Sequence, residues 1–266
     1  MNVFWHELKL RRKSFFFWAC GMVLLIILSM AKYETISAGG GVEIQKMLEQ
    51  FPQTVQAIFG MNGLDIMTVA GYYGVCFLFI AVMAAIHAGL LGANMLAEEE
   101  QLKTSEFLYT KPRSRETIIS AKMFAGTVMM IGMWIATLSG SIVGIQAFAS
   151  MNNFWTDFWL FMIALGFIQL VFFSLGVLSA SLSHRANDAA KPIAIIVFVS
   201  YLLYVFARFS PQLDWLQYGS IFSWFDAADI IRSHSINGYY IILCLIITCV
   251  TLWFASIVYT RRDLRI

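Results

Sequence analysis

The sequence predicts an all-α fold, that of a polytopic integral membrane protein with six transmembrane helices. Hydrophobic residues make up 59% of the 266 residues, and the mean hydropathy is +0.72. Charged residues make up only 13%, against about 25% in a typical soluble domain. A soluble domain of this size cannot bury so much apolar surface, and disordered chains do not contain it. The net charge of +2 argues against a nucleic-acid partner.

Six long runs without charged residues place the membrane spans. The hydrocarbon core of a bilayer is about 30 Å thick, which a helix of about 20 residues crosses. We therefore expect a single transmembrane domain, residues 1–266. The first run has the basic start of a signal peptide, but it is long for one and five more runs follow. The predicted spans are residues 14–32, 68–97, 118–149, 156–182, 190–208 and 238–260.

The distribution of Lys and Arg predicts the orientation of these spans. An even number of spans places both termini on one side of the membrane. That side also receives 14 of the 18 Lys and Arg residues, whereas Asp and Glu divide equally between the two sides. Basic residues accumulate on the cytoplasmic side of membrane proteins. We therefore expect a multi-pass protein of the cell membrane, with both termini in the cytoplasm.

Polar residues are rare within the spans. No Asp or Glu lies inside the six apolar runs, which argues against a proton-coupled carrier. His87 and Asn94 lie seven residues apart in the second span and share one helix face. They are candidates for a substrate path, although a hydrogen bond between two helices is the alternative interpretation.

Small residues mark two places where helices can approach closely. The second span carries Ala81, Ala85, Gly89 and Ala93 on one face, and the third contains a GxxxG pattern at Gly140 and Gly144. Such faces pack against other helices, either within the chain or at a subunit interface.

Motifs for catalysis, metal binding and nucleotide binding are missing. The chain has no GxxxxGK[ST], HExxH or GxSxG pattern, and its four cysteines lie apart in apolar runs without a CxxC spacing. We therefore predict no catalytic residue, no metal site and no cofactor in this chain.

Residues 98–117, which connect the second and third spans, hold the most charged segment of the chain. Thr104 can cap a short helix that Pro112 ends, with Glu106 in its first turn. Phe107 and Leu108 place apolar side chains in this otherwise polar segment. The pattern indicates a short helix with an apolar tip that projects into the cytoplasm. The alternative is a solvated loop whose aromatic rings lie on the lipid headgroups.

This segment resembles the corresponding loop of type-two ABC transporter permeases, the membrane subunits of ATP-driven exporters. The stretches Phe51–Gly60, Gly71–Tyr73 and Ser220–Asp226 are also similar to the family. Lys103 departs from the pattern, because the family usually has a small residue there. The residues that match the family pattern of the loop are Glu98, Glu99, Thr104, Glu106, Leu108, Pro112, Ser114, Arg115 and Lys122.

The resemblance implies an assembly in a bacterial cell membrane. Two permeases, identical or related, pair with two stand-alone nucleotide-binding subunits, which hold ATP and Mg²⁺. The loop then acts as a coupling helix that docks on an ATPase subunit, with a second contact near His184. The residues assigned to coupling are Glu98, Glu99, Thr104, Glu106, Phe107, Leu108, Pro112, Arg113, Arg115, Lys122, His184 and Arg185.

The resemblance also implies an N-terminal interfacial amphipathic helix, residues 1–13, that lies along the cytoplasmic face of the membrane. In such a helix Trp5 faces lipid, while Lys9, Arg11 and Arg12 reach lipid phosphates.

We therefore interpret the chain as the permease subunit of an ABC exporter, without enzymatic activity of its own. The many aromatic and Met residues of the spans favour a hydrophobic or amphipathic substrate, such as an antimicrobial peptide, a drug or a lipid-like molecule. Two alternatives remain open at this point. The chain could be a sensor or scaffold that binds an ATPase without transporting, or an intramembrane enzyme without recognisable motifs.

The predicted orientation can be tested by cysteine labelling in a background without the four native cysteines. Single cysteines at Gly40 and Gln212 are expected to react with an impermeant thiol reagent in intact cells, because both positions face outward. Cysteines at Gln101 and Ser183 are expected to react only after the membrane is opened. Labelling at Gln101 in intact cells would contradict the orientation.

Overall fold

The structure, a computed structural model, describes residues 3–39, 52–61, 63–101, 115–149, 154–183, 188–209 and 211–261. Every regular element in these residues is helical, which confirms the all-α class. The long helices are α1 (Val3–Gly39), α4 (Val69–Gln101), α6 (Arg115–Phe148), α7 (Trp155–Leu182), α8 (Ala190–Ala207) and α11 (Gly238–Arg261). The short elements are α3 (Gln53–Ile58), the 3₁₀ helix η2 (Pro211–Gly219), α9 (Ile221–Trp224) and α10 (Ala227–Ser233).

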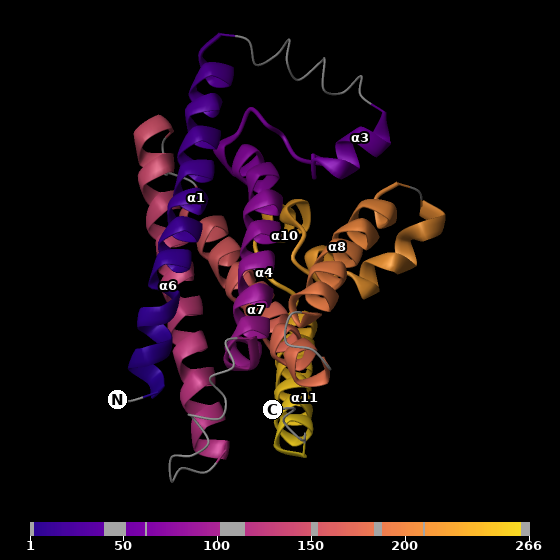
Figure 1. Cartoon of the computed structure of the whole chain (residues 1–266). Coiled ribbons are helices and arrows are strands. Elements are labelled where there is room, and N and C mark those ends of the chain that lie inside the picture. Colours follow the sequence, from indigo (N-terminus) through magenta and orange to yellow (C-terminus); the bar gives the residue numbers. More distant parts are fainter. Residues whose placement is uncertain are drawn as a thin grey trace.

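In the described part of the chain six helices are long and apolar enough to cross a membrane, which confirms the predicted number of spans. Figure 1 shows the two chain ends at the same end of the bundle, as an even number of crossings requires. We call this the terminal end. The opposite end, which carries α3, is called the distal end.

The first helix differs from the prediction. α1 runs without interruption from Val3 to Gly39, so residues 3–13 form its first three turns, about 16 Å of helix. The separate interfacial helix predicted for residues 1–13 is therefore not present in the described residues. No Gly or Pro interrupts the sequence between Val3 and Phe16. Glu7 and Arg11 on this segment are buried against neighbouring helices, which holds the segment in line with the span.

α4 and α7 form the centre of the bundle, and small residues allow their backbones to touch. A Cβ atom added at Gly176 would collide with the carbonyl oxygen of Gly89, and one added at Gly92 would collide with that of Phe173. Such close contact lets two helices gain dispersion energy along their length. The small-residue face of the second span therefore packs inside the chain. Its alanines, Ala81, Ala85 and Ala93, are all buried.

α1 and α6 form a second pair of helices that lie side by side (Figure 1). Gly144 of α6 lies against Ile26 and Met30 of α1, and Gly140 lies against Val23. The GxxxG pattern thus also serves packing within the chain. α11 packs against α7, and α8 packs against α4.

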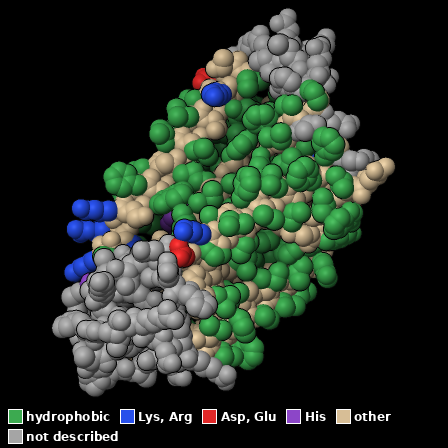
Figure 2. Space-filling view, turned by 45° about the vertical axis from the view of Figure 1, so that its right-hand side comes forward, with side chains coloured by type: hydrophobic (Ala, Val, Ile, Leu, Met, Phe, Trp, Pro, Cys, Tyr) green, Lys and Arg blue, Asp and Glu red, His purple; other side chains and the backbone are tan. Residues whose placement is uncertain are grey.

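The outer surface of the bundle is strongly apolar. In Figure 2 hydrophobic side chains cover most of the visible face, and several Lys and Arg side chains gather beside the grey segment at the lower left. Phe17 of α1 is 74% exposed and Trp253 of α11 is 66% exposed. Apolar surface of this extent is unusual on a soluble monomer, and it suits contact with lipid or another subunit.

The contact between α4 and α7 gives a stability prediction. Gly176→Ala is expected to lower the thermal unfolding midpoint of the purified chain, because the added methyl group forces the two backbones apart at a cost of about 1–3 kcal/mol. Gly166→Ala is the matched control, since its Cβ would meet only Trp134 at 3.6 Å. A midpoint for Gly176→Ala equal to that of the control would contradict this account of the packing.

Candidate functional site

A carboxylate and two cations are buried together at the terminal end of the bundle. Glu7 of α1 accepts a hydrogen bond from Lys122 of α6, with 2.7 Å between Oε1 and Nζ. Arg11 donates to the other oxygen of Glu7, with 3.3 Å between Nε and Oε2. The side chains of Lys122 and Glu7 are only 1% and 2% exposed. We call Glu7, Arg11 and Lys122 the Glu7 cluster.

Both cations of the Glu7 cluster also bind the backbone of α4. Nζ of Lys122 donates to the carbonyl oxygen of Met95 at 2.9 Å, and Nη2 of Arg11 donates to that of Asn94 at 2.7 Å. These carbonyl groups lie about two turns before the C-terminal end of α4 at Gln101. The cluster therefore joins α1, α4 and α6 at one point.

The joined helices are the ones that flank the predicted coupling loop. α4 ends at Gln101 and α6 begins at Arg115, so residues 102–114 connect them. Lys122 lies two turns into α6 and Met95 lies in the second-last turn of α4. A force on the connecting segment would thus reach both helices close to the Glu7 cluster, and through it α1.

The structure describes only some of the predicted coupling residues. Glu98 and Glu99 lie in the last turn of α4 and Arg115 begins α6, but their side chains are outside the described residues. Lys122 requires a correction, because its side chain is buried on Glu7 and cannot face a partner protein. Residues predicted for coupling that lie wholly outside the described residues are Thr104, Glu106, Phe107, Leu108, Pro112, Arg113, His184 and Arg185.

The residues predicted to contact lipid divide into two groups. Trp5, Lys9 and Arg12 are exposed on α1, where they can meet lipid or solvent. Arg11 is only 8% exposed and binds Glu7 and α4, so the prediction that it extends to lipid phosphates like its neighbours needs correction. Arg11 and Lys122 are buried at the same place, where both bind the carboxylate of Glu7.

His87 and Asn94 line a cavity between α1, α4 and α6, together with Arg11 and Trp18. The cavity has a volume of about 80 Å³. His87 is 5% exposed, and its Nδ1 atom has no hydrogen-bond partner among the described residues. The structure therefore does not place Nδ1 in the hydrogen bond between helices that was the alternative interpretation. The ring instead lies beside Trp18, with 5.5 Å between centroids.

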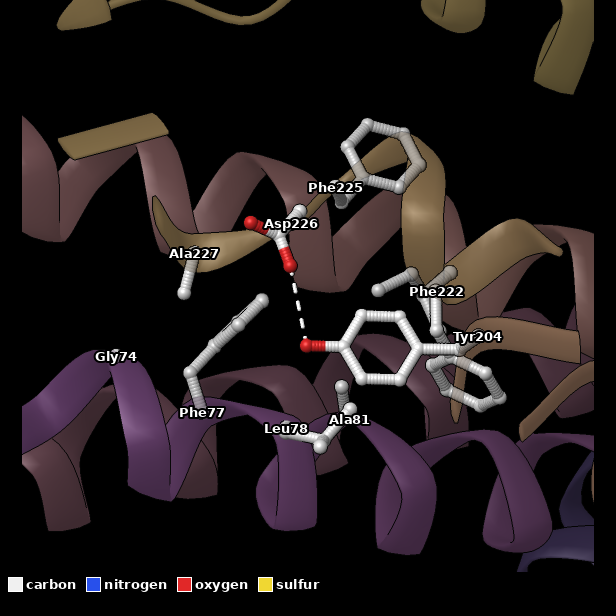
Figure 3. A pocket seen from close by; sticks show the side chains of 10 residues that line it. Gly74, Phe77, Leu78, Ala81, Tyr204, Phe222, Phe225, Asp226 and Ala227 are labelled. Atoms are coloured by element: carbon white, nitrogen blue, oxygen red, sulfur yellow. Dashed lines mark hydrogen bonds between the residues drawn. The ribbon is translucent and has the colours of Figure 1, made fainter. Parts of the chain in front are cut away.

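A second buried carboxylate lies toward the distal end. Asp226 accepts from the hydroxyl group of Tyr204 at 3.0 Å, and Arg208 lies 2.9 Å from the same oxygen. Its other oxygen caps α10 by accepting from the backbone N–H groups of Ala228 and Asp229. Figure 3 shows Tyr204 of α8 and Asp226 pointing toward each other between aromatic and aliphatic side chains. We call Tyr204, Arg208 and Asp226 the Asp226 cluster.

The Asp226 cluster holds two helices together and leaves no room for a ligand. The cavity beside it has a volume of only about 10 Å³, which is the space of one water molecule at most. Burial raises the pKa of the Asp226 carboxyl, and the Arg208 guanidinium beside it opposes this rise. The cluster ties α8 to α10 through one carboxylate.

Sequence analysis did not predict that Glu7, Arg208 and Asp226 form ion pairs inside the bundle. The spacing of four residues between Glu7 and Arg11 indicates an ion pair on a helix, and Asp before a helical run indicates an N-cap. No local pattern connects Glu7 with Lys122, because they are 115 residues apart. In the residues that the structure describes, no three His, Cys, Asp or Glu side chains meet where they could hold a metal ion.

Comparison with known protein families gives one match over nearly the whole chain. The family model described as ABC-2 family transporter protein matches residues 1–264. The matched range includes all six long helices and both buried clusters. A comparison with curated proteins finds no match.

The Glu7 cluster gives a prediction about stability. Glu7→Gln is expected to destabilise the purified chain by about 3–5 kcal/mol, because it leaves Lys122 and Arg11 buried without this carboxylate. The double variant Glu7→Gln/Lys122→Met is expected to recover part of the loss. Thermal unfolding in one detergent measures both effects.

Lys191→Met is the matched control for the Glu7 cluster. It breaks the exposed ion pair with Asp188, whose side chains are 73% and 44% exposed, and is expected to cost less than about 1 kcal/mol. If Glu7→Gln were as stable as Lys191→Met, the Glu7 cluster would not hold the three helices.

Proposed function

The chain belongs to the ABC-2 family of transporter proteins, and we propose that it is the permease subunit of an ATP-driven exporter. In this proposal separate nucleotide-binding subunits hydrolyse ATP, and two permeases, identical or related, enclose the substrate path between them. Both termini and residues 102–114 lie on the cytoplasmic side of a bacterial cell membrane. The chain itself performs no chemistry.

The position of the Glu7 cluster is the observation that supports a transmission of movement from the ATPase to the helices. An ATPase subunit that closes on ATP must move the permease through a protein contact. Residues 102–114 follow α4 and precede α6, and the Glu7 cluster fastens both helices to α1 close to that segment. A displacement of the segment would therefore move three helices together instead of bending one of them.

The packing of the rest of the chain supports transmission along the bundle. α4 packs most extensively on α7 through backbone contacts, and closely packed helices transmit displacement rather than absorb it. Asp226 and Arg208 tie α10 to α8 beyond the midpoint of the bundle. A movement that begins at the terminal end can thus reach α8 and α10 through α4, which contacts both.

The surface chemistry supports a hydrophobic or amphipathic substrate. The exposed side chains of α8 and α11 are mainly apolar, and the middle of α1 exposes Phe16, Phe17, Leu24 and Leu28. Two cavities among the described residues have volumes of about 10 and 80 Å³, and neither holds a drug-sized molecule. In the proposed assembly the substrate would therefore pass between two chains, along apolar helix faces.

The coupling role is tested by binding to the cognate nucleotide-binding subunit. Phe107→Ala is expected to weaken association by on the order of 2 kcal/mol, a factor of roughly 30, if this ring fills a groove on the partner. Glu106→Arg is expected to slow association when a basic residue faces it. Co-purification at matched membrane levels, together with transport by the same cells, measures both effects.

Phe59→Ala is the matched control, because Phe59 is a 43% exposed aromatic residue beside α3, at the distal end. It is expected to leave ATPase binding unchanged. Undiminished binding and transport in both loop variants would remove this segment as the coupling element. Normal ATPase binding by a chain that transports nothing would instead favour a sensor or scaffold.

A further inference from the structure

We propose that Asp226 makes a proton-operated contact toward the distal end of the bundle, and that uptake of a proton by its carboxylate strengthens the link between α8 and α10. The proton would come from the aqueous side at the distal end. The proposal concerns this chain alone, and it requires neither an ATPase subunit nor a transported substrate. It rests on the burial of Asp226, on the way its neighbours share their charges and on the contacts that join α8 to α10.

The carboxylate of Asp226 is buried, and both of its oxygen atoms are engaged. Its side chain is 4% exposed. Oδ2 accepts from the hydroxyl group of Tyr204 at 3.0 Å and lies 2.9 Å from Nη2 of Arg208. Oδ1 accepts from the N–H groups of Ala228 and Asp229 at 3.0 and 3.3 Å. Apart from Tyr204 and Asp226 itself, every residue that lines the adjacent cavity is apolar or glycine, so these residues do not compensate a negative charge.

Arg208 neutralises Asp226 only in part, because its charge is shared and partly exposed. The same Nη2 atom lies 3.7 Å from the carboxylate of Asp229, which is 61% exposed. The Arg208 side chain is itself 24% exposed, and contact with water weakens its attraction for Asp226. Arg232 pairs with Asp229 at 3.9 Å and is 74% exposed. Burial therefore raises the pKa of the Asp226 carboxyl above its ordinary value, while Arg208 opposes the rise and Asp229 adds to it.

The link between α8 and α10 depends on this carboxyl group. α10 packs against α4 and α7, and its described polar contacts with α8 are those of Tyr204 and Arg208. If α10 moved away from α8, the Asp226 carboxyl would meet water and return to its ordinary acidity. The closed contact therefore binds a proton more tightly than the open one, and a ligand shifts an equilibrium toward the state that binds it more tightly. Acid is thus expected to favour the closed contact.

The sign of the effect fixes the pH range. A carboxyl whose pKa is raised by burial contributes its full stability below the ordinary Asp value of about 4, and this stability is lost as the pH rises through the raised pKa. The link between α8 and α10 is therefore expected to be firmest near pH 4 and weaker at neutral pH. A pKa difference of one between the open and the closed contact changes their ratio about tenfold.

A second titratable group adjoins α10 and has to be distinguished from Asp226. His234 directly follows α10, and its Nδ1 atom lies 2.6 Å from Oδ1 of Asp157 in the first turn of α7. Histidine is the residue type that ordinarily changes its charge between about pH 5 and pH 8. The experiment therefore includes a variant of each residue.

The test measures hydrogen exchange of the α10 backbone amides in the full-length chain, purified alone in detergent, between about pH 7 and about pH 4. Mass spectrometry gives the protection, which is the factor by which the structure slows exchange relative to an unstructured chain at the same pH. Protection of α10 in the wild-type protein is expected to rise as the pH falls. Asp226→Asn is uncharged and keeps an oxygen atom for the N-cap, so it is expected to lose this dependence. Asp214→Asn is the matched control, because Asp214 is an exposed residue of η2, and it is expected to keep the dependence.

Two further variants separate the groups around α10. Arg208→Gln removes the charge that opposes protonation of Asp226, so the rise in protection is expected at a higher pH than in the wild-type protein. His234→Asn keeps a nitrogen donor and suits the left-handed backbone of this residue, whose φ is 48°. It is expected to keep the wild-type dependence on pH.

Circular dichroism and gel filtration establish that each variant is folded. The wild-type dependence in folded Asp226→Asn, or its loss in folded His234→Asn, would overturn the assignment to Asp226. If Asp226→Asn does not fold, a rise in Arg208→Gln at the same pH as in the wild-type protein, or at a lower one, would overturn it instead. Wild-type protection that falls with acid would overturn the direction of the effect. Because no ATPase is present, the result is independent of the coupling experiment on Phe107.

Discussion

A carboxylate buried between helices needs cations beside it, and this requirement organises the terminal end of the bundle. Glu7 is 2% exposed and has Lys122 at 2.7 Å and Arg11 at 3.3 Å. An unpaired carboxylate in such a place would cost several kcal/mol. Since its partners come from α1 and α6 and also bind carbonyl oxygens of α4, one neutralised charge fixes three helices. The continuous α1 follows from the same contacts, because they hold its first turns inside the bundle.

The Asp226 cluster repeats this principle toward the distal end. Asp226 neutralises Arg208, accepts from Tyr204 and caps α10, so a single side chain joins the last turn of α8 to the start of α10. Between the two clusters the helices are held by the close packing of their backbones. Gly89, Gly92 and Gly176 bring α4 and α7 into backbone contact. Ion pairs at two levels and close packing between them hold the helices together along the bundle.

This arrangement suits a subunit that is moved by a separate ATPase subunit. In the proposed exporter the ATPase would act on residues 102–114, and the Glu7 cluster would distribute the displacement over α1, α4 and α6. The cavity that contains His87 lies beside the same cluster and shares Arg11 with it.

The sequence by itself determined the helical class, the number of spans and the family resemblance. These depend on charge-free runs and on short motifs, which are local properties of the chain. It also placed His87 and Asn94 on one face of one helix, but could not show that Arg11 and Trp18 complete a cavity around them. Lys122 was predicted to face a partner and Arg11 to extend to lipid, whereas both bind Glu7. Only the tertiary structure decided these points, because Lys122 is 115 residues from Glu7 and Arg11 is 83 residues from the Asn94 carbonyl that it binds, and no local pattern spans such separations.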